Sequence, residues 1–101
     1  MELNNCNAVI TGGASGLGGA TADIIIKNGG HVTIIDIQNE LGNKKSEELG
    51  ENCNYINIDI TNEDLVSENF SEIIKNTGPI NLAVNCAGIG SPSKVLNKAL
   101  F

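Results

Sequence analysis

A glycine-rich segment sets the strongest limit on how this chain can fold. Residues 11–18 read Thr-Gly-Gly-Ala-Ser-Gly-Leu-Gly and lie between a short apolar run and a stretch with helical spacing. Glycine lacks a Cβ atom, so the backbone can turn sharply and its N–H groups can approach a phosphate at a helix N-terminus. The pattern is T-G-x-x-x-G-x-G, and the generic G-x-G-x-x-G spacing is not met. The segment predicts a strand-to-helix turn that binds a pyrophosphate; a tight turn without a ligand is the alternative.

Apolar runs rich in β-branched residues alternate with segments of helical spacing. The runs cover residues 8–11, 32–35, 55–60 and 82–84, and the helical segments cover residues 17–27, 40–49 and 62–76. Nearly continuous apolar strands with helices between them are typical of a parallel sheet covered on both faces. We therefore predict an α/β fold with about four strands in the order 3-2-1-4, as in half of a doubly wound sheet. No repeat or linker is found, so residues 1–101 are expected to form a single incomplete domain, with residues 89–101 irregular.

The third helical segment carries the clearest start and stop signals. Thr61 and Asp64 have the spacing of a capping box, and Gly78 with Pro79 follows the segment as a helix stop. Glycines also follow the first two helical segments, at residues 29–30 and 50. The apolar positions of the third segment recur with helical spacing: Leu65, Val66, Phe70, Ile73 and Ile74.

Asp36 ends the second apolar run, 18 residues beyond Gly18. A dinucleotide-binding unit has an acidic residue there that binds the 2′-hydroxyl of the adenosine ribose. A carboxylate at this position repels a 2′-phosphate, and the chain contains no arginine that could bind one. The pattern therefore predicts NAD as the cofactor in preference to NADP. A solvated strand end is the alternative for Asp36.

The charge of the chain argues against two classes of partner. Six lysines oppose 12 acidic residues, which gives a net charge of −6, so binding to nucleic acid or to an anionic membrane is not expected. Three cysteines, an odd number without C-x-x-C spacing, argue against a disulfide framework and favour a reducing compartment. No metal-ligand spacing is found among them. The apolar runs are too short to span a membrane, and Glu2 lies where a presequence would carry basic residues, so we expect an intracellular, cytoplasmic protein.

A second motif, Asn85-Cys86-Ala87-Gly88, follows the fourth apolar run. Together with the glycine-rich segment it makes residues 7–96 resemble the N-terminal part of the short-chain dehydrogenase/reductase family, which has a Rossmann fold and oxidises or reduces a secondary alcohol or ketone with a nicotinamide cofactor. Within the family, the chain is most similar to the type 2 subgroup of 3-hydroxyacyl-CoA dehydrogenases, which shares Cys86 and belongs to fatty-acid and steroid metabolism. Members of that subgroup work in mitochondria, which makes this compartment an alternative.

The resemblance implies a set of contacts to NAD. The pyrophosphate would lie along Gly12, Ser15, Gly16, Leu17 and Gly18, the adenosine ribose at Asp36, the adenine at Asp59 and Ile60, and the nicotinamide ribose along Asn85, Ala87 and Gly88. For Asp59 the alternative is a cap on the helical segment that follows. Asn85 is also expected to bridge strands of the sheet. We interpret Cys6 and Cys53 as packing residues.

The catalytic residues of the family have no counterpart in these 101 residues. The family uses a tyrosine with a lysine four residues later, a serine and an asparagine, whereas Tyr55, the sole tyrosine, has Asp59 four residues later. No catalytic residue is therefore assigned, and we expect the NAD-binding portion of an oxidoreductase that takes an alcohol or a hydroxyacyl-CoA only if a catalytic half is supplied. The alternatives are a non-catalytic module that binds a nucleotide or a partner, and an inactive truncated product. The fourth strand would then be a sheet edge through which the chain self-associates.

Overall fold

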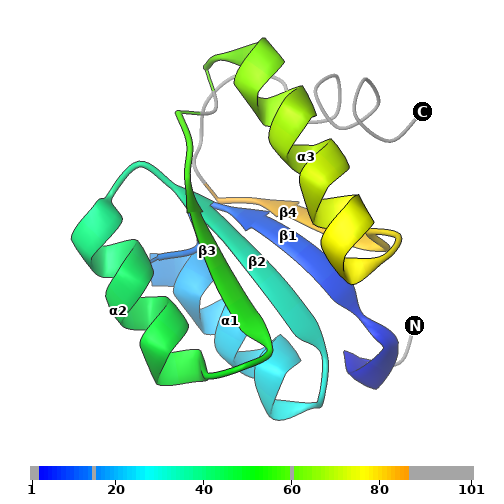
Figure 1. Cartoon of the computed structure of the whole chain (residues 1–101). Coiled ribbons are helices and arrows are strands. Elements are labelled where there is room, and N and C mark those ends of the chain that lie inside the picture. Colours follow the sequence, from blue (N-terminus) through cyan, green and yellow to red (C-terminus); the bar gives the residue numbers. More distant parts are fainter. Residues whose placement is uncertain (1–2, 15, 60, 87–101) are drawn as a thin grey trace.

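The computed structural model describes residues 3–14, 16–59 and 61–86. Four parallel strands form one sheet in the order β3-β2-β1-β4, with α1 and α2 on one face and α3 on the other (Figure 1). This arrangement confirms the predicted α/β fold and strand order. The elements are η1 (Leu3–Asn5), β1 (Asn7–Thr11), α1 (Gly16–Lys27), β2 (His31–Asp36), α2 (Asn39–Leu49), β3 (Cys53–Asn57), α3 (Glu63–Thr77) and β4 (Leu82–Asn85). The expected irregular segment 89–101 lies outside the described residues.

The two central strands are buried on both faces, which explains why their sequences are almost continuously apolar. Successive side chains of a strand point to opposite faces, so β1 and β2 each contribute to two clusters. One cluster packs against α1 and α2 and contains Cys6, Ala8, Ile10, Ala22, Ile25, Val32, Ile34 and Cys53. The other packs against α3 and contains Val9, Ile35, Ile58, Val66, Phe70 and Ile73.

The predicted capping residue of α3 is wrong by one position. Asn62 is the N-cap, and its Oδ1 accepts a hydrogen bond from the N–H of Leu65 at 3.1 Å. Asparagine caps helices as well as threonine does. The hydroxyl of Thr61 donates instead to Oδ1 of Asp59 at 2.6 Å, so it is engaged in the preceding loop.

The predicted third strand is also misplaced, because the strand begins and ends earlier in the sequence. β3 covers Cys53–Asn57, and its last pair in the sheet is Asn57 with Asp36, the final residue of β2. Ile58 lies beyond the strand but is 4% exposed and packs against α3, so its apolar character comes from helix packing and not from strand pairing. Ile60, the end of the predicted strand, lies outside the described residues.

Glycines follow the three α-helices as predicted, at Gly29, Gly50 and Gly78, all with positive φ. In the part of the chain that the structure describes, no helix combines the length and the apolar character that crossing a bilayer requires. The three cysteines are free thiols, and Cys6 and Cys53 are buried. Burial raises the pKa of Cys53 to about 11, which keeps this thiol protonated and unreactive at neutral pH.

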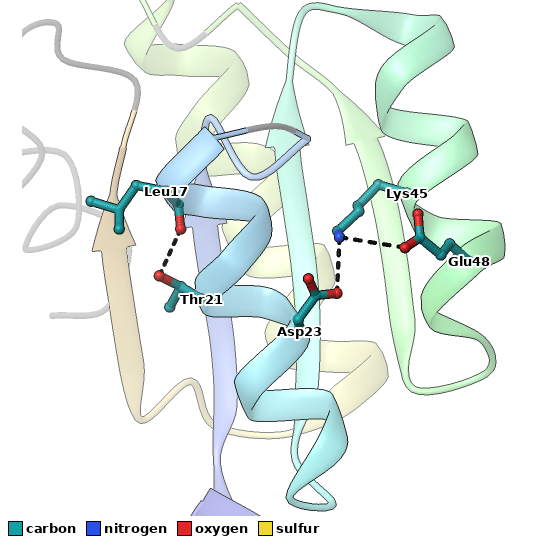
Figure 2. A network of polar contacts seen from close by, with 5 residues as sticks. All are labelled: Leu17, Thr21, Asp23, Lys45 and Glu48. Carbon is teal, nitrogen blue, oxygen red and sulfur yellow. Dashed lines mark hydrogen bonds and ion pairs between the residues drawn. The ribbon is translucent and has the colours of Figure 1, made fainter.

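Lys45 of α2 joins the two helices that share a face of the sheet (Figure 2). Its Nζ lies 2.9 Å from Oδ1 of Asp23 on α1 and 3.9 Å from Oε1 of Glu48 on its own helix. The stem of Lys45 passes over Gly19, where an added Cβ would lie 3.5 Å from the lysine Cε. Asp23 is half exposed, so this ion pair is worth about 1 kcal/mol at most.

Side-chain hydrogen bonds fix β4 to β1 at both ends. At the start of the strands, Oδ1 of Asn81 accepts from the N–H of Asn7 at 2.7 Å. At the other end, the hydroxyl of Thr11 donates to Oδ1 of Asn85 at 2.7 Å. Within the described residues β4 pairs with β1 alone, and its first three side chains are half-buried.

Candidate functional site

The carboxyl ends of the four strands meet at one edge of the sheet, where Thr11, Asp36, Asn57 and Asn85 are the last strand residues. After β1 the chain goes to β2 on one side, and after β3 it crosses over to β4 on the other side of β1. Ligands of open α/β sheets bind outside the carboxyl ends of the strands, where the strand order reverses. In this sheet that point lies between β1 and β4.

The glycine-rich turn begins at this point and is fixed to the neighbouring strand. Gly12 has a φ of +71° and donates its N–H to the carbonyl of Ile35 at 2.7 Å. A Cβ at Gly18 would lie 2.3 Å from the carbonyl oxygen of Gly12 and 2.9 Å from the Cα of Gly13. The start of α1 therefore packs directly against the backbone of the glycine-rich turn. This close approach admits no side chain at Gly18.

The start of α1 is open. Gly16 has a φ of +58°, and a Cβ there would meet no atom of the described residues within 4 Å. The side chain of Leu17 is 76% exposed. The backbone N–H groups at a helix N-terminus favour an anion, and the space beside Gly16 and Leu17 leaves room for one. Ser15, predicted as part of the same contact, lies outside the described residues.

Asp36 lies between the glycine-rich turn and the turn that leads into α2. Its Oδ2 accepts from the N–H of Ala14 at 3.3 Å and its Oδ1 from the N–H of Gln38 at 3.0 Å. The residue is 8% exposed, so the alternative of a solvated strand end does not describe it. A carboxylate has about four lone-pair sites, so after these two bonds it can still accept from two hydroxyl groups.

The backbone that carries Asp36 is itself held by side chains of β3. The hydroxyl of Tyr55 donates to the carbonyl of Asp36 at 2.8 Å. Nδ2 of Asn57 donates to the carbonyl of Ile37 at 3.1 Å and to the hydroxyl of Tyr55 at 3.0 Å. The turn at residues 36–38 is therefore tied to the edge strand by two hydrogen bonds, and the third bond joins the two donor side chains within β3.

On the other side of the glycine-rich turn, Asn85 fulfils the predicted bridging role. Its Oδ1 accepts from the hydroxyl of Thr11, and the N–H of Cys86 donates to the carbonyl of Thr11 at 2.8 Å. These bonds hold the ends of β1 and β4 together beside the turn. Ala87 and Gly88, the remaining predicted contacts of this motif, lie outside the described residues.

Asp59 follows β3 in an exposed loop. Its Oδ1 accepts from the N–H of Thr61 at 2.9 Å and from the hydroxyl of the same residue. Both hydrogen bonds favour the ionised form and lower the pKa of Asp59. The carboxylate orders the loop before α3 and does not cap the helix, because Asn62 does so. Ile60, expected to contact the same ring as Asp59, lies outside the described residues.

Sequence reasoning missed four residues of this edge: Thr11, Ala14, Tyr55 and Asn57. Two signals pointed to three of them. Thr11 is a polar residue at the end of a buried apolar strand, where its hydroxyl needs a partner. Tyr55 and Asn57 share one face of β3 by the period of two, the same face as the buried Cys53. The N–H of Ala14 had no sequence signal, since any residue but proline supplies one.

Comparison with known proteins gives one consistent result. A family model described as short chain dehydrogenase matches residues 6–100. The chain is 37% identical over 95 residues to 3-hydroxyacyl-CoA dehydrogenase type-2 of Drosophila melanogaster and 41% identical over 90 residues to the Homo sapiens protein of that name. It is also 40% identical over 88 residues to secoisolariciresinol dehydrogenase of Forsythia intermedia. These alignments cover 94%, 89% and 86% of this chain.

The same proteins are much longer than the chain. The alignments cover 37%, 34% and 32% of the three relatives, so the chain spans about a third of their length. Among solved structures, a short chain dehydrogenase from Bacillus anthracis superposes with a TM-score of 0.80 at 24% identity, over 86% of this chain and 36% of that one. This structural likeness supports the fold.

Proposed function

Because the chain belongs to the short-chain dehydrogenase family, whose members are oxidoreductases that bind a nicotinamide cofactor, we propose that it binds NAD at the carboxyl edge of its sheet. The observation that carries this proposal is the carboxylate of Asp36. It is held by the N–H of Ala14 in the glycine-rich turn, so the acid and the phosphate-binding backbone form one unit.

The described residues fit a dinucleotide. The open N-terminus of α1 at Gly16 and Leu17 receives the pyrophosphate, and Gly12 and Gly18 let the turn pack closely enough to present its N–H groups. In this proposal the carboxylate of Asp36 accepts hydrogen bonds from the adenosine ribose, Asp59 contacts the adenine, and Asn85 contacts the nicotinamide ribose. When bound, NAD supplies the acceptor of a hydride.

The second part of the proposal concerns the reaction. We place the chain as the nucleotide-binding part of an oxidoreductase that acts on a secondary alcohol, of the 3-hydroxyacyl-CoA class that the names of two relatives give. Tyr55 does not supply the acid/base group within these residues, because its hydroxyl is engaged between Asp36 and Asn57. The residue four positions after Tyr55 is Asp59 and not a lysine. A non-catalytic module that binds a nucleotide or a partner is the second candidate, favoured by the edge position of β4 in the described sheet.

We expect the 101-residue chain to bind NAD in a calorimetric titration and to form no NADH with a short 3-hydroxyacyl-CoA. A positioned acid/base group contributes roughly 10²–10⁴-fold to such a step, and oriented reactants contribute still more. The Asp36→Ala variant is the control for binding at the proposed site and should titrate more weakly. A flat titration with the unchanged chain would contradict the NAD site. Turnover of about one per second, within the usual enzyme range, would contradict the absence of catalysis.

The edge position of β4 leads to a further expectation about assembly. Unpaired backbone groups on an edge strand recruit other strands, so the isolated chain should associate as its concentration is raised in light scattering. Ala83→Lys should reduce this association, because a charged side chain on an edge strand opposes further pairing. Ser71→Lys, on the exposed side of α3, is the matched control with the same change in charge. A monodisperse monomer at all concentrations would contradict the expectation.

A further inference from the structure

We propose that Tyr55 and Asn57 are positioning residues that hold Asp36 for the adenosine ribose, an inference that rests on the NAD site proposed above. Neither side chain needs to touch the nucleotide. They bind two successive backbone carbonyls, those of Asp36 and Ile37, and the position of that backbone decides where the carboxylate lies.

The hydrogen bonds form a directed chain. Nδ2 of Asn57 has two hydrogens, which donate to the carbonyl of Ile37 and to the hydroxyl of Tyr55. The hydroxyl of Tyr55 donates its single hydrogen to the carbonyl of Asp36. Each donor of the two side chains is therefore used, and hydrogen bonds in such a chain strengthen one another.

This series of hydrogen bonds begins where the pairing between β2 and β3 ends. Asp36 and Asn57 are the last pair of the β2–β3 register. Beyond that pair, the bonds from Tyr55 and Asn57 take over from the sheet and secure the carbonyls of residues 36 and 37. The next residue, Gln38, donates its N–H back to Oδ1 of Asp36. A shift of this turn would therefore carry the carboxylate away from the glycine-rich turn.

Packing also fixes the tyrosine. Its ring lies against Gly42 of α2, where an added Cβ would be 2.1 Å from Cε1 of the ring. Gly42 is buried and is the fourth residue of the helix, although glycine is a poor helix former. Its absence of a side chain makes the space for the ring. The contact of the ring with α2 therefore helps to hold the hydroxyl at the carbonyl of Asp36.

The test is a double-mutant cycle of NAD affinity, measured by calorimetry, with Tyr55→Phe and Asp36→Ala alone and combined. Removing the hydroxyl leaves the carbonyl of Asp36 without its partner, and we expect NAD to bind about three- to tenfold more weakly. If Tyr55 acts through the carboxylate, the same change in the Asp36→Ala background should have an effect below about twofold, because the group to be positioned is gone.

A matched control separates positioning from general stability. The hydroxyl of Ser46 on α2 donates to the carbonyl of Cys53 at 3.1 Å, at the opposite end of β3 from the site. Ser46→Ala removes one hydrogen bond of the same kind, from a side-chain hydroxyl to a backbone carbonyl, but between α2 and β3. It should therefore lower the melting temperature as Tyr55→Phe does while leaving NAD affinity unchanged. Asn57→Ala is the second test variant. This residue is exposed, so the change should be tolerated, and it should weaken NAD binding only when Asp36 is present.

The outcomes distinguish this inference from the NAD site itself. An equal loss of affinity from Tyr55→Phe in both backgrounds, or an equal loss from Ser46→Ala, would overturn the positioning role while leaving the NAD site intact. The positioning role would also be overturned if Tyr55→Phe and Asn57→Ala both bound NAD with unchanged affinity while Asp36→Ala bound it more weakly. Failure of the unchanged chain to bind NAD would overturn the proposed function and this inference with it.

Discussion

Replacing Gly18 with alanine should reduce NAD affinity by about a hundredfold or more and lower the free energy of unfolding by about 1–3 kcal/mol. The new Cβ would lie 2.3 Å from the carbonyl oxygen of Gly12. The oxygen belongs to the backbone and the Cβ is bonded directly to it, so neither atom can rotate away. The glycine-rich turn must therefore move by about 1 Å to reach an ordinary contact distance. Such a shift displaces the N–H groups proposed to bind the pyrophosphate.

The adjacent residue provides the control. A Cβ at Gly19 would lie 3.5 Å from Cε of Lys45 and 3.8 Å from the backbone of Ala14, which are ordinary contacts. Gly19→Ala should therefore leave NAD binding unchanged and stabilise the chain by about 0.5–1 kcal/mol through helix propensity. Urea unfolding and calorimetric titration of both variants measure the contrast. Equal behaviour of the two alanines would show that the turn and α1 are not in close contact.

NAD should bind at least about a hundredfold more tightly than NADP, which corresponds to about 2.7 kcal/mol. The 2′-phosphate of NADP would meet the carboxylate of Asp36, and two like charges in contact at a partly buried site repel each other by several kcal/mol. No arginine occurs in the chain to offset this repulsion. Asp36→Ala should weaken NAD binding and narrow the ratio between the two nucleotides.

A second acid tests whether the effect is local. Glu72 is exposed on α3, which covers the face of the sheet opposite α1 and α2, and Glu72→Gln removes one negative charge there (Figure 1). It should leave the ratio of the two affinities unchanged, since exposed charges farther apart than a Debye length are screened. Tighter binding of NADP than of NAD by the unchanged chain would contradict the preference.

The fold was predictable wherever local pattern and burial agree. The apolar runs that became β1 and β2 are buried on both faces, and the helices end at glycines, so pattern and structure coincide there. They diverge after β3. Ile58 looks like a continuation of the strand, but α3 buries it, and sequence alone does not separate a residue buried by a neighbouring strand from one buried by a helix.

The site was predictable to the extent that backbone geometry dictates residue type. A side chain at Gly18 would meet the backbone of Gly12, so glycine is required there and a single sequence reveals it, whereas the role of Asp36 stays a prediction. The bond from Tyr55 to the carbonyl of Asp36 joins residues 19 positions apart, and that from Thr11 to Asn85 joins residues 74 positions apart. Such bonds depend on the register between strands, which the local pattern does not contain.

The strand order also leads us to expect a particular sequence of events in folding. Ala8 pairs with Val32, 24 positions further along the chain, but with Leu82 on its other side, 74 positions further along. Closing the threefold longer loop costs about 1 kcal/mol more in chain entropy. The unit of β1, α1, β2, α2 and β3 is continuous in sequence, so we expect it to assemble while the rest of the chain is still being synthesised. The adenosine side of the nucleotide site would then exist before the nicotinamide side, which waits for β4 to arrive beside β1.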